Sequence, residues 1–440
     1  MKVIDLSNED PNKSVHNLPS DVSIKLTEIS KIIFKSRRST VLTGAGISCN
    51  AGIPDFRSSD GLYNLVKSKY PNCVVKGQDL FDISLFRDEI TLQLFCTFME
   101  SLYSSSLKAT PTETHKFIKT LKEKNKLLRC YTQNIDGLEG KINLKTGINL
   151  NDFNIEASNK RQVNSSFNKI WKDLDVIQLH GSLNELSCTH CFANFEWTEN
   201  YKDMLSNGSN PECENCCLNY EKRLFEGKRI TGNIGILRPG IVLYGENHPQ
   251  SEILAQGLNN DLKSKPDLLI IMGTSLKVDG VKKLVKSLAK SIHERGGKVI
   301  FVNKTPVNNS WENYIDYSIL SDCDNFIKFL KQEIPDLFLT QQELDLKKLH
   351  KQQLREKIKA EREKVKIEKQ IKKEIKQEKL DQIPSDDLTD VDLTPPTSPT
   401  KRVALKRRDT NITHSNKKIK FELPTPLSSF NEVTVVKQEI

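Results

Sequence analysis

The 440-residue sequence has no long hydrophobic run, because its longest wholly apolar stretch is Leu268–Met272. A helix that spans a membrane needs about 20 apolar residues. Residues 1–20 also lack the apolar segment of a secretory signal peptide. We therefore expect a protein of the cytosol or nucleus that has no membrane partner.

A strong net charge is also missing from most of the chain. Of the formal net charge of +9, the last hundred residues contribute +6, with 23 Lys and Arg against 17 Asp and Glu. The excess in the rest of the chain is too small to predict nucleic-acid binding from charge alone. Direct, sequence-specific DNA binding is therefore not expected.

Cysteines are present, ten in all, but disulfides are not expected in a chain without a secretory signal. The pairs Cys188-x-x-Cys191 and Cys213-x-x-Cys216 have the spacing with which four thiolates enclose Zn²⁺. Because four protein ligands leave no open coordination position, we predict one structural zinc ion. Cys217 is an alternative to Cys216 as the fourth ligand.

Short apolar segments alternate with helical patterns along much of the chain. Strand-like segments occupy residues 40–43, 127–132, 176–179, 268–272 and 298–302. Apolar residues recur with helical spacing over residues 24–33, 92–103, 115–122 and 281–293. The alternation predicts an α/β fold of the Rossmann-like kind, a doubly wound parallel sheet with helices on both faces.

Composition also suggests how the chain is divided. Residues 1–22 are polar and are predicted to be disordered, whereas residues 23–340 should form the main domain. Within it we expect a small zinc-ribbon module at about residues 185–225 and a solvated insertion loop at about 141–168. Residues 341–380 predict an exposed charged helix, and residues 381–440 a disordered regulatory tail.

Polar motifs stand at the ends of the predicted strands. Besides Gly44–Arg57, they are Tyr131–Gly137, Leu179–Gly181, Met272–Ser275 and Val302–Lys304. Ligands of an open parallel sheet bind at these carboxyl ends, so the motifs predict a nucleotide site. The turn Gly44-x-Gly46 lacks the third glycine of the dinucleotide fingerprint, which disfavours an ordinary hydride-transferring enzyme.

The order of these motifs resembles the sirtuins, the NAD-dependent protein-lysine deacylases. The resemblance covers about residues 25–335 and is carried by GAGIS and GIPDFR (Gly44–Arg57), TQNIDGLE (Thr132–Glu139), His180-Gly181, the paired cysteines, PGIVLYGE (Pro239–Glu246), GTSLKV (Gly273–Val278) and FVN (Phe301–Asn303). Residues 56–71 and 76–86 are similar to the fungal nuclear branch, which acts on acetylated histone H3 in its globular core. The resemblance implies NAD⁺ as co-substrate, and acetylated histone H3 and nucleosomes as partners.

The resemblance also implies a role for each motif. The acetyl-lysine oxygen attacks the nicotinamide ribose, and the products are nicotinamide, 2′-O-acetyl-ADP-ribose and free lysine. His180 would be the general base, with Asn134 and Asp136 as the other catalytic residues, at the nicotinamide ribose and carboxamide. The remaining cofactor-binding residues would be Gly44, Ala45, Gly46 and Arg57 at the diphosphate, Phe56 over the nicotinamide, Gln133 at ribose hydroxyls, Gly273, Thr274 and Ser275 on the phosphate side, Asn303 at the adenosine ribose and Cys323 by the adenine. Asp55, Ile135 and Lys304 would also contact the cofactor.

For the peptide substrate, the resemblance implies contacts with Val242, Gly245 and Glu246. Leu243 and Tyr244 stand where the family usually has two aromatic residues, so the acyl chain that the enzyme prefers stays open. The alternatives are an ADP-ribosyltransferase or long-chain deacylase on the same scaffold, and a non-catalytic zinc-bearing chromatin-binding module. The intact catalytic residues argue against the last of these.

The tail carries signals of its own. Basic clusters at residues 401–402, 406–408 and 417–420 resemble a nuclear localisation signal, which predicts a protein of the nucleus. Thr394, Ser398 and Thr425 each precede a proline, as at sites of proline-directed kinases. Phosphates there would create a docking site for a ubiquitin ligase, and hence regulated turnover.

Overall fold

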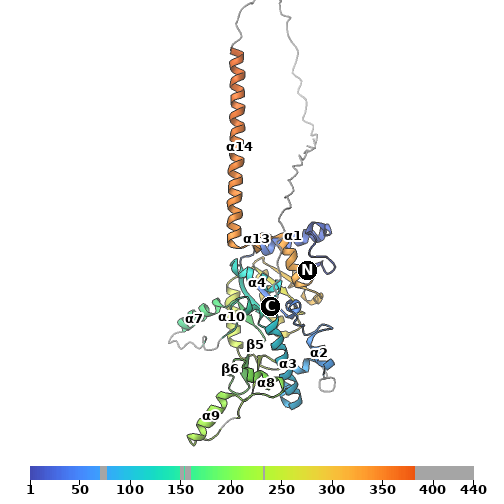
Figure 1. Ribbon diagram of the computed structural model, residues 1–440, viewed down its shortest axis with the longest axis vertical. Helices are drawn as coiled ribbons and strands as arrows, with labels where there is room; N and C mark the ends of the chain where they lie inside the picture. Colours follow the sequence, from blue (N-terminus) through green and yellow to red (C-terminus); the bar gives the residue numbers. More distant parts are fainter. Residues whose placement is uncertain (70–76, 149–152, 154–159, 231–232, 382–440) are drawn as a thin grey trace, which may run out of the picture. The chain divides into compact units, whose positions relative to one another are not determined.

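The computed structural model describes residues 1–69, 77–148, 153, 160–230 and 233–381 (Figure 1). The localisation signal and the three phosphorylation sites predicted in the tail lie outside the described residues, as does much of the predicted insertion loop. The chain divides into two compact units, Met1–Lys357 and the part from Ile358 onward, and each is considered by itself.

The described residues form a seven-stranded sheet in which every neighbouring pair is parallel, in the order β1-β10-β9-β8-β2-β3-β4. The strands are β1 (Lys2–Asp5), β2 (Ser39–Thr43), β3 (Leu127–Thr132), β4 (Val176–Gln178), β8 (Leu268–Met272), β9 (Lys298–Asn303) and β10 (Tyr317–Leu320). The last residue of β2, Thr43, is in register with both Met272 and Thr132. The carboxyl ends of the central strands therefore lie side by side, and the predicted doubly wound sheet is confirmed.

Helices cover both faces of this sheet. One face carries α1 (Ser20–Lys35), α4 (Glu113–Glu123), α12 (Cys323–Glu333) and α13 (Pro335–Phe338), and the other carries α7 (Lys160–Asp173), α10 (Ser251–Lys263) and α11 (Asp279–His293). Successive strand residues serve opposite faces, since Val41 packs in the first core and Leu42 in the second. All five residues of β2 and of β8 are buried, as expected for central parallel strands.

A third core belongs to a smaller subdomain. It contains α2 (Leu62–Lys69), α3 (Glu89–Lys108), α8 (Glu199–Ser206), α9 (Glu214–Phe225) and an antiparallel sheet of β5 (Gly181–Cys188), β6 (Asn194–Phe195) and β7 (Leu237–Ile241). Tyr103 of α3 stacks on Trp197 with 4.1 Å between ring centroids. The antiparallel sheet extends past residue 225, where the zinc module was predicted to end.

Short elements complete the described chain. They are α5 (Leu138–Lys141) and the 3-10 helices η1 (Val15–Asn17), η2 (Ala45–Ile47), η3 (Cys49–Ala51), η4 (Gly77–Phe81), η5 (Ile83–Arg87) and η6 (Asn309–Trp311). Both η2 and η3 follow β2 directly, so the glycine-rich segment turns tightly at the edge of the sheet.

The prediction of a disordered N-terminus is wrong. Residues 2–5 form β1, an edge strand that pairs with β10, and Ile4 and Leu6 are both buried. An edge strand needs only one buried face and one partner, so the two buried residues Ile4 and Leu6 are sufficient. The polar residues that follow, from Ser7 to Ser14, concealed this short apolar segment.

The predicted insertion loop is corrected at its end, because α7 begins at Lys160. Phe167 and Trp171 lie four residues apart on this helix and are both buried against the sheet. Asn and Lys dominate the surrounding sequence and masked this helical spacing.

The charged helix predicted at residues 341–380 agrees with α14 (Gln341–Asp381). Through residue 375 its side chains are exposed, apart from the half-buried Leu344. Among the helices that the structure describes, none has the length and apolar character of a membrane span.

Candidate nucleotide and zinc sites

A cavity of about 1450 Å³ opens at the carboxyl ends of the central strands. Of the residues predicted at the cofactor and the peptide, those that line it are Gly44, Ala45, Gly46, Asp55, Phe56, Arg57, Gln133, Ile135, His180, Val242, Gly245, Glu246, Gly273, Thr274, Ser275, Asn303, Lys304 and Cys323. Segments separated by more than two hundred residues thus converge on one space. Asn134 and Asp136 are the two predicted residues that lie beneath its lining.

The glycines after β2 are required by a close approach of two loops. The Gly44 N–H donates to the Met272 carbonyl at 3.0 Å, and the Gly46 N–H to the Gly273 carbonyl at 2.9 Å. A Cβ atom at Gly46 would lie 2.8 Å from the Gly273 Cα. These glycines therefore let the loop after β2 pack on the loop after β8, a reason that adds to the predicted approach of a phosphate.

Asn134 and Asp136 are joined through Ser48. The Asn134 Nδ2 donates to Ser48 Oγ at 3.1 Å, and Ser48 Oγ donates to Asp136 Oδ2 at 2.6 Å. The Leu138 N–H donates to Asp136 Oδ1 at 3.1 Å. Ser48 was not predicted as a site residue, although its place in the motif GAGIS was a signal for it. These hydrogen bonds fix both predicted catalytic side chains against Ser48 in the loop after β2.

His180 lies between β4 and β5, where its ring reaches the loop after β3. Its Nδ1 is 3.0 Å from the Gln133 carbonyl oxygen, which can only accept, so Nδ1 carries the proton. In the neutral ring Nε2 is then free to act as a base. Burial lowers the pKa of His180, against the raising effect of the bond to Gln133, and the charge of Arg57 lowers it further. The neutral form is thus favoured.

A second histidine, His248, also lines the cavity and was missed. Its Nδ1 accepts from the Gln250 N–H at 3.0 Å. Burial lowers the pKa of His248, and the nearby His180 lowers it further. No motif or spacing in the sequence pointed to this residue.

The loop after Pro54 is held by its own polar groups. Asp55 Oδ1 accepts from the Arg57 N–H at 2.7 Å and from the Ser58 N–H at 2.8 Å, so its carboxylate shapes the turn. Arg57 donates to the Tyr244 hydroxyl at 2.9 Å. Phe56 packs edge-on against Phe81, with 5.4 Å between the centroids. Arg57 and Tyr244 thus meet at the mouth of the cavity.

The predicted peptide-binding segment is partly used by the protein itself. The Val242 N–H donates to the His180 carbonyl at 2.9 Å, and the Tyr244 N–H to the Phe81 carbonyl at 2.8 Å. The Glu246 carboxylate pairs with Arg238 and accepts from the Leu243 N–H. The Glu246 N–H donates to the Leu243 carbonyl in a turn, so this N–H is already engaged within the protein.

At the far end of the cavity, the side chains come from the loops after β8, β9 and β10. Gln133 Nε2 donates to Thr274 Oγ1 at 2.9 Å, which joins the loops after β3 and β8. Lys304 pairs with Asp322 at 3.1 Å, and Asn303 Nδ2 donates to Thr305 Oγ1 at 2.8 Å. Cys323 begins α12 and is buried.

The four predicted zinc cysteines come together at one end of the small subdomain. The sulfur atoms of Cys188, Cys191, Cys213 and Cys216 all lie within 4.8 Å of one another. The distance is 3.7 Å between the sulfurs of Cys188 and Cys216 and 3.5 Å between those of Cys191 and Cys213. A tetrahedron with Zn–S bonds of about 2.3 Å has edges of roughly 3.8 Å, so the quartet fits the ion.

Two neighbours of the quartet refine the prediction. The sulfur of Cys217 lies 3.9 Å from Glu212 Oε2, and this residue is not part of the quartet, so Cys216 is the better fourth ligand. Gly235, which was not predicted as a site residue, leaves room for the quartet, because a Cβ atom there would lie 2.4 Å from the Cys188 sulfur. Burial raises the pKa of Cys188, but the N–H groups of Cys191 and His190 outweigh it and leave the pKa at about 7. Cys188 is therefore favoured as a thiolate, whereas burial raises the pKa of Cys191 and of Cys213.

The chain is similar to several known proteins. Residues 44–152 and 169–280 match the model of the Sir2 family. The chain is 66% identical over 336 residues to the "NAD-dependent histone deacetylase HST3" of Candida albicans, covering 76% of this chain and 67% of the relative. It is 54% identical over 349 residues to the protein of that name from Saccharomyces cerevisiae, covering 77% of this chain and 75% of the relative. A solved structure described as "Sir2 bound to acetylated peptide" aligns with 70% of this chain and 98% of its own, at 24% identity and a TM-score of 0.48. By its family match and its relatives, the chain belongs to the Sir2 family.

Proposed function

We propose that this protein is an NAD-dependent protein-lysine deacetylase that acts on acetylated histones in the nucleus. The observation that carries the proposal is the convergence of His180, Gln133 and the two glycine loops on one cavity. Family membership and the names of two relatives that share more than half of their aligned residues with this chain support the same activity. The reaction converts NAD⁺ and acetyl-lysine to nicotinamide, 2′-O-acetyl-ADP-ribose and lysine.

The cavity fits a dinucleotide in two respects. The loops after β2 and β8 begin with Gly44 and Gly273, which have no side chain to keep a phosphate away from the backbone, as at other nucleotide sites. Asn134 Oδ1 is buried and lacks a hydrogen-bond donor among the described residues, so it offers an acceptor to a ligand. Gly44 to Gly46, Arg57, Gln133 and Gly273 to Ser275 would hold the dinucleotide, and its glycosidic bond would supply the reactive carbon.

Other residues of the cavity would orient the nicotinamide end of the dinucleotide and accept a proton from its ribose. Asn134 and Asp136, tied through Ser48, would orient the nicotinamide end, and Phe56 would cover that side of the cavity. The His180 Nε2 would take a proton from a ribose hydroxyl, because Nδ1 is engaged by the Gln133 carbonyl. The lowered pKa of His180, which burial causes, keeps this base unprotonated at neutral pH.

The substrate is proposed to be histone H3 in nucleosomes, acetylated in its globular core. The names of the relatives specify histones, whereas the similarity of residues 56–71 and 76–86 to the fungal nuclear branch carries the finer assignment. The basic clusters in residues 401–420 support entry into the nucleus. Control of turnover by a ubiquitin ligase is proposed through Thr394, Ser398 and Thr425, and alanine at all three sites should lengthen the half-life of the protein.

The test incubates the chain with NAD⁺ and a panel of acetylated histone peptides and nucleosomes, and measures 2′-O-acetyl-ADP-ribose by mass spectrometry. His180→Ala should lower the rate by about 100-fold or more, because the general base is lost. His350→Ala, at an exposed position of α14, is the matched control and should leave the rate unchanged. If ADP-ribose remained attached to the protein substrate, the protein would instead be an ADP-ribosyltransferase. If only lysines with long acyl chains reacted, it would instead be a long-chain deacylase.

A further inference from the structure

Asp136 belongs to a buried group of three ionisable side chains. His115 of α4, Asp136 and Glu139 of α5 place one nitrogen or oxygen atom each within 4.8 Å of the others. His115 and Glu139 are 0% exposed, and Asp136 is 5% exposed. The proposed mechanism leaves His115 and Glu139 without a task, so the cluster requires a separate explanation.

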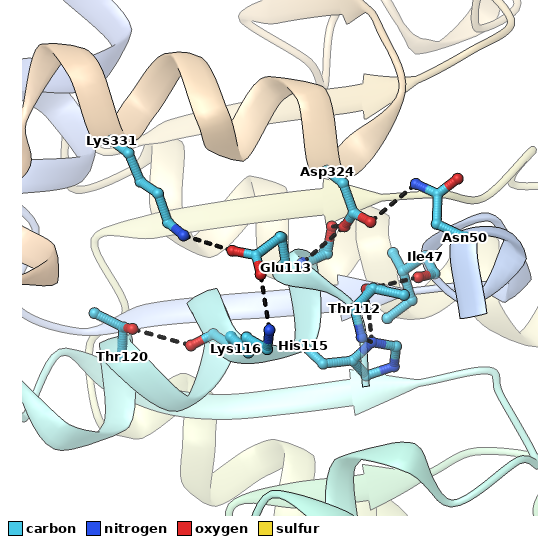
Figure 2. A network of polar contacts seen from close by, with 10 residues as sticks. Ile47, Asn50, Thr112, Glu113, His115, Lys116, Thr120, Asp324 and Lys331 are labelled. Carbon is cyan, nitrogen blue, oxygen red and sulfur yellow. Dashed lines mark hydrogen bonds and ion pairs between the residues drawn. The ribbon is translucent and has the colours of Figure 1, made fainter. Parts of the chain in front are cut away.

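The tautomer of His115 follows from its hydrogen bonds. The Thr112 N–H donates to His115 Nδ1 at 3.2 Å, and Thr112 Oγ1, which lies 2.9 Å from the same Nδ1, donates to the Ile47 carbonyl at 2.9 Å (Figure 2). A backbone N–H can only donate, so Nδ1 accepts from it. With Nδ1 as an acceptor, the neutral ring carries its proton on Nε2. This Nε2 is buried and has no partner in the described part of the chain. It is therefore a donor available to the two carboxyl groups.

Glu139 differs from Asp136 in its partners. Asp136 accepts hydrogen bonds at both oxygens, from Ser48 Oγ and from the Leu138 N–H. Both carboxyl oxygens of Glu139 are buried without a hydrogen bond of normal geometry to any described residue. Burial, followed by the charge of Asp136, raises the pKa of Glu139 to about 7, against the lowering effect of its own N–H and the Thr132 hydroxyl.

We propose that Glu139 is a positioning residue that shares one proton with Asp136, while the His115 Nε2–H donates to the same pair. One polar atom of each residue lies within 4.8 Å of the others, so these bonds require the Glu139 carboxyl group to turn towards Asp136 and His115. Asp136 would then be fixed from both sides and would hold Asn134 through Ser48. This inference rests on the proposed function, because it assigns Glu139 a part in presenting the nicotinamide end of the site.

Two further ionisable groups of the described residues, Asp324 and Cys130, lie beside the cluster. Asp324 of α12 accepts from the Thr114 N–H at 2.8 Å and from Asn50 Nδ2 at 2.9 Å, and Figure 2 shows it beside Asn50. Cys130 of β3 is buried, and both its burial and the Glu139 charge raise its pKa. Burial lowers the pKa of His115, although Asp136 and Asp324 oppose this, so the ring stays neutral.

Loss of the shared proton has a definite consequence. Above the pKa of Glu139, two carboxylates would face each other in a buried site, and their repulsion would displace Asp136. The Asn134 amide would move with it through Ser48. We therefore expect the KM for NAD⁺ to rise about tenfold over one pH unit beyond this transition, whereas kcat changes little.

The test is the pH dependence of NAD⁺ binding and turnover in Glu139→Gln. The amide is uncharged at every pH and can still donate to Asp136, so this variant should keep the KM of the unaltered protein at low pH and lose the rise at high pH. Glu123→Gln, which changes an exposed carboxylate of α4, is the matched control and should retain the rise. A rise that persists in Glu139→Gln would overturn the proposal.

A second measurement needs neither a variant nor turnover. Infrared spectra of the unaltered protein should contain a protonated-carboxyl band that disappears across neutral pH, and its absence would also overturn the proposal. So would a stoichiometric divalent cation besides zinc, because a cation would replace the shared proton. A protein that binds NAD⁺ with this pH dependence but never deacetylates would refute the proposed function and leave the Glu139 assignment standing.

Discussion

The nucleotide cavity and the zinc module reach their geometry by different means. In the cavity, the side chains beneath the lining are bonded to one another, as in the chain from Asn134 through Ser48 to Asp136. In the zinc module, four sulfurs face each other across short gaps, and backbone N–H groups support Cys188. The first site is organised by the polypeptide alone, whereas the second requires an ion. The two should therefore fail in different ways.

Removing one zinc ligand should produce the largest effect. Cys216→Ser should lose the metal and unfold the small subdomain, because structural zinc contributes roughly several kcal/mol or more to folding. Zinc content and thermal unfolding would measure this. Cys217→Ser is the control in the adjacent position and should keep one zinc per chain. Loss of zinc in Cys217→Ser, with retention in Cys216→Ser, would reverse the ligand assignment.

Removing the hydrogen bonds of Ser48 should reduce the free energy of unfolding by less than the loss of zinc does. Ser48→Ala leaves Asp136 Oδ2 and Asn134 Nδ2 without their shared partner, so we expect a loss of about 1–3 kcal/mol in the free energy of unfolding and a higher KM for NAD⁺. Chemical denaturation and steady-state kinetics would test both, with zinc content unchanged. Ser101→Ala, on the exposed face of α3, serves as the control. An unaltered KM for NAD⁺ would mean that the cavity does not depend on the hydrogen bonds through Ser48.

A change of pH should have the smallest effect and should separate the two sites without mutation. Because the folded protein lowers the pKa of His180 below 6.5, the active neutral form persists into mildly acidic solution. Activity should then fall about tenfold per pH unit only below that lowered pKa. Profiles of kcat/KM against pH, with zinc content measured in parallel, would test this. A midpoint above 6.5 would contradict the environment described for His180.

Motifs placed at strand ends were sufficient to predict much of the cavity. Because parallel strands end at the same edge of the sheet, Gly44, Gln133 and Asn303 could be brought together from local patterns alone. The cysteine spacing likewise predicted the quartet, since metal geometry restricts which thiolates can meet.

The sequence was less informative wherever a residue acts through a distant partner. Asp261 of α10 accepts from Arg129, Tyr131 and Trp171, three residues of two other elements, and no local period marks this buried contact. His248 depends on the fold of the loop after β7, and β1 is defined by a partner strand near the other end of the domain. Such positions are determined by tertiary packing, which periodicity does not encode.

The edge strand β1 has a consequence for synthesis of the protein. Lys2 is in register with Tyr317, so β1 is translated roughly three hundred residues before its partner strand β10. During that interval Ile4 and Leu6, both buried in the finished domain, lack that partner strand beside them. β1 therefore docks long after its own synthesis, and until β10 emerges its apolar side chains stay exposed on the nascent chain.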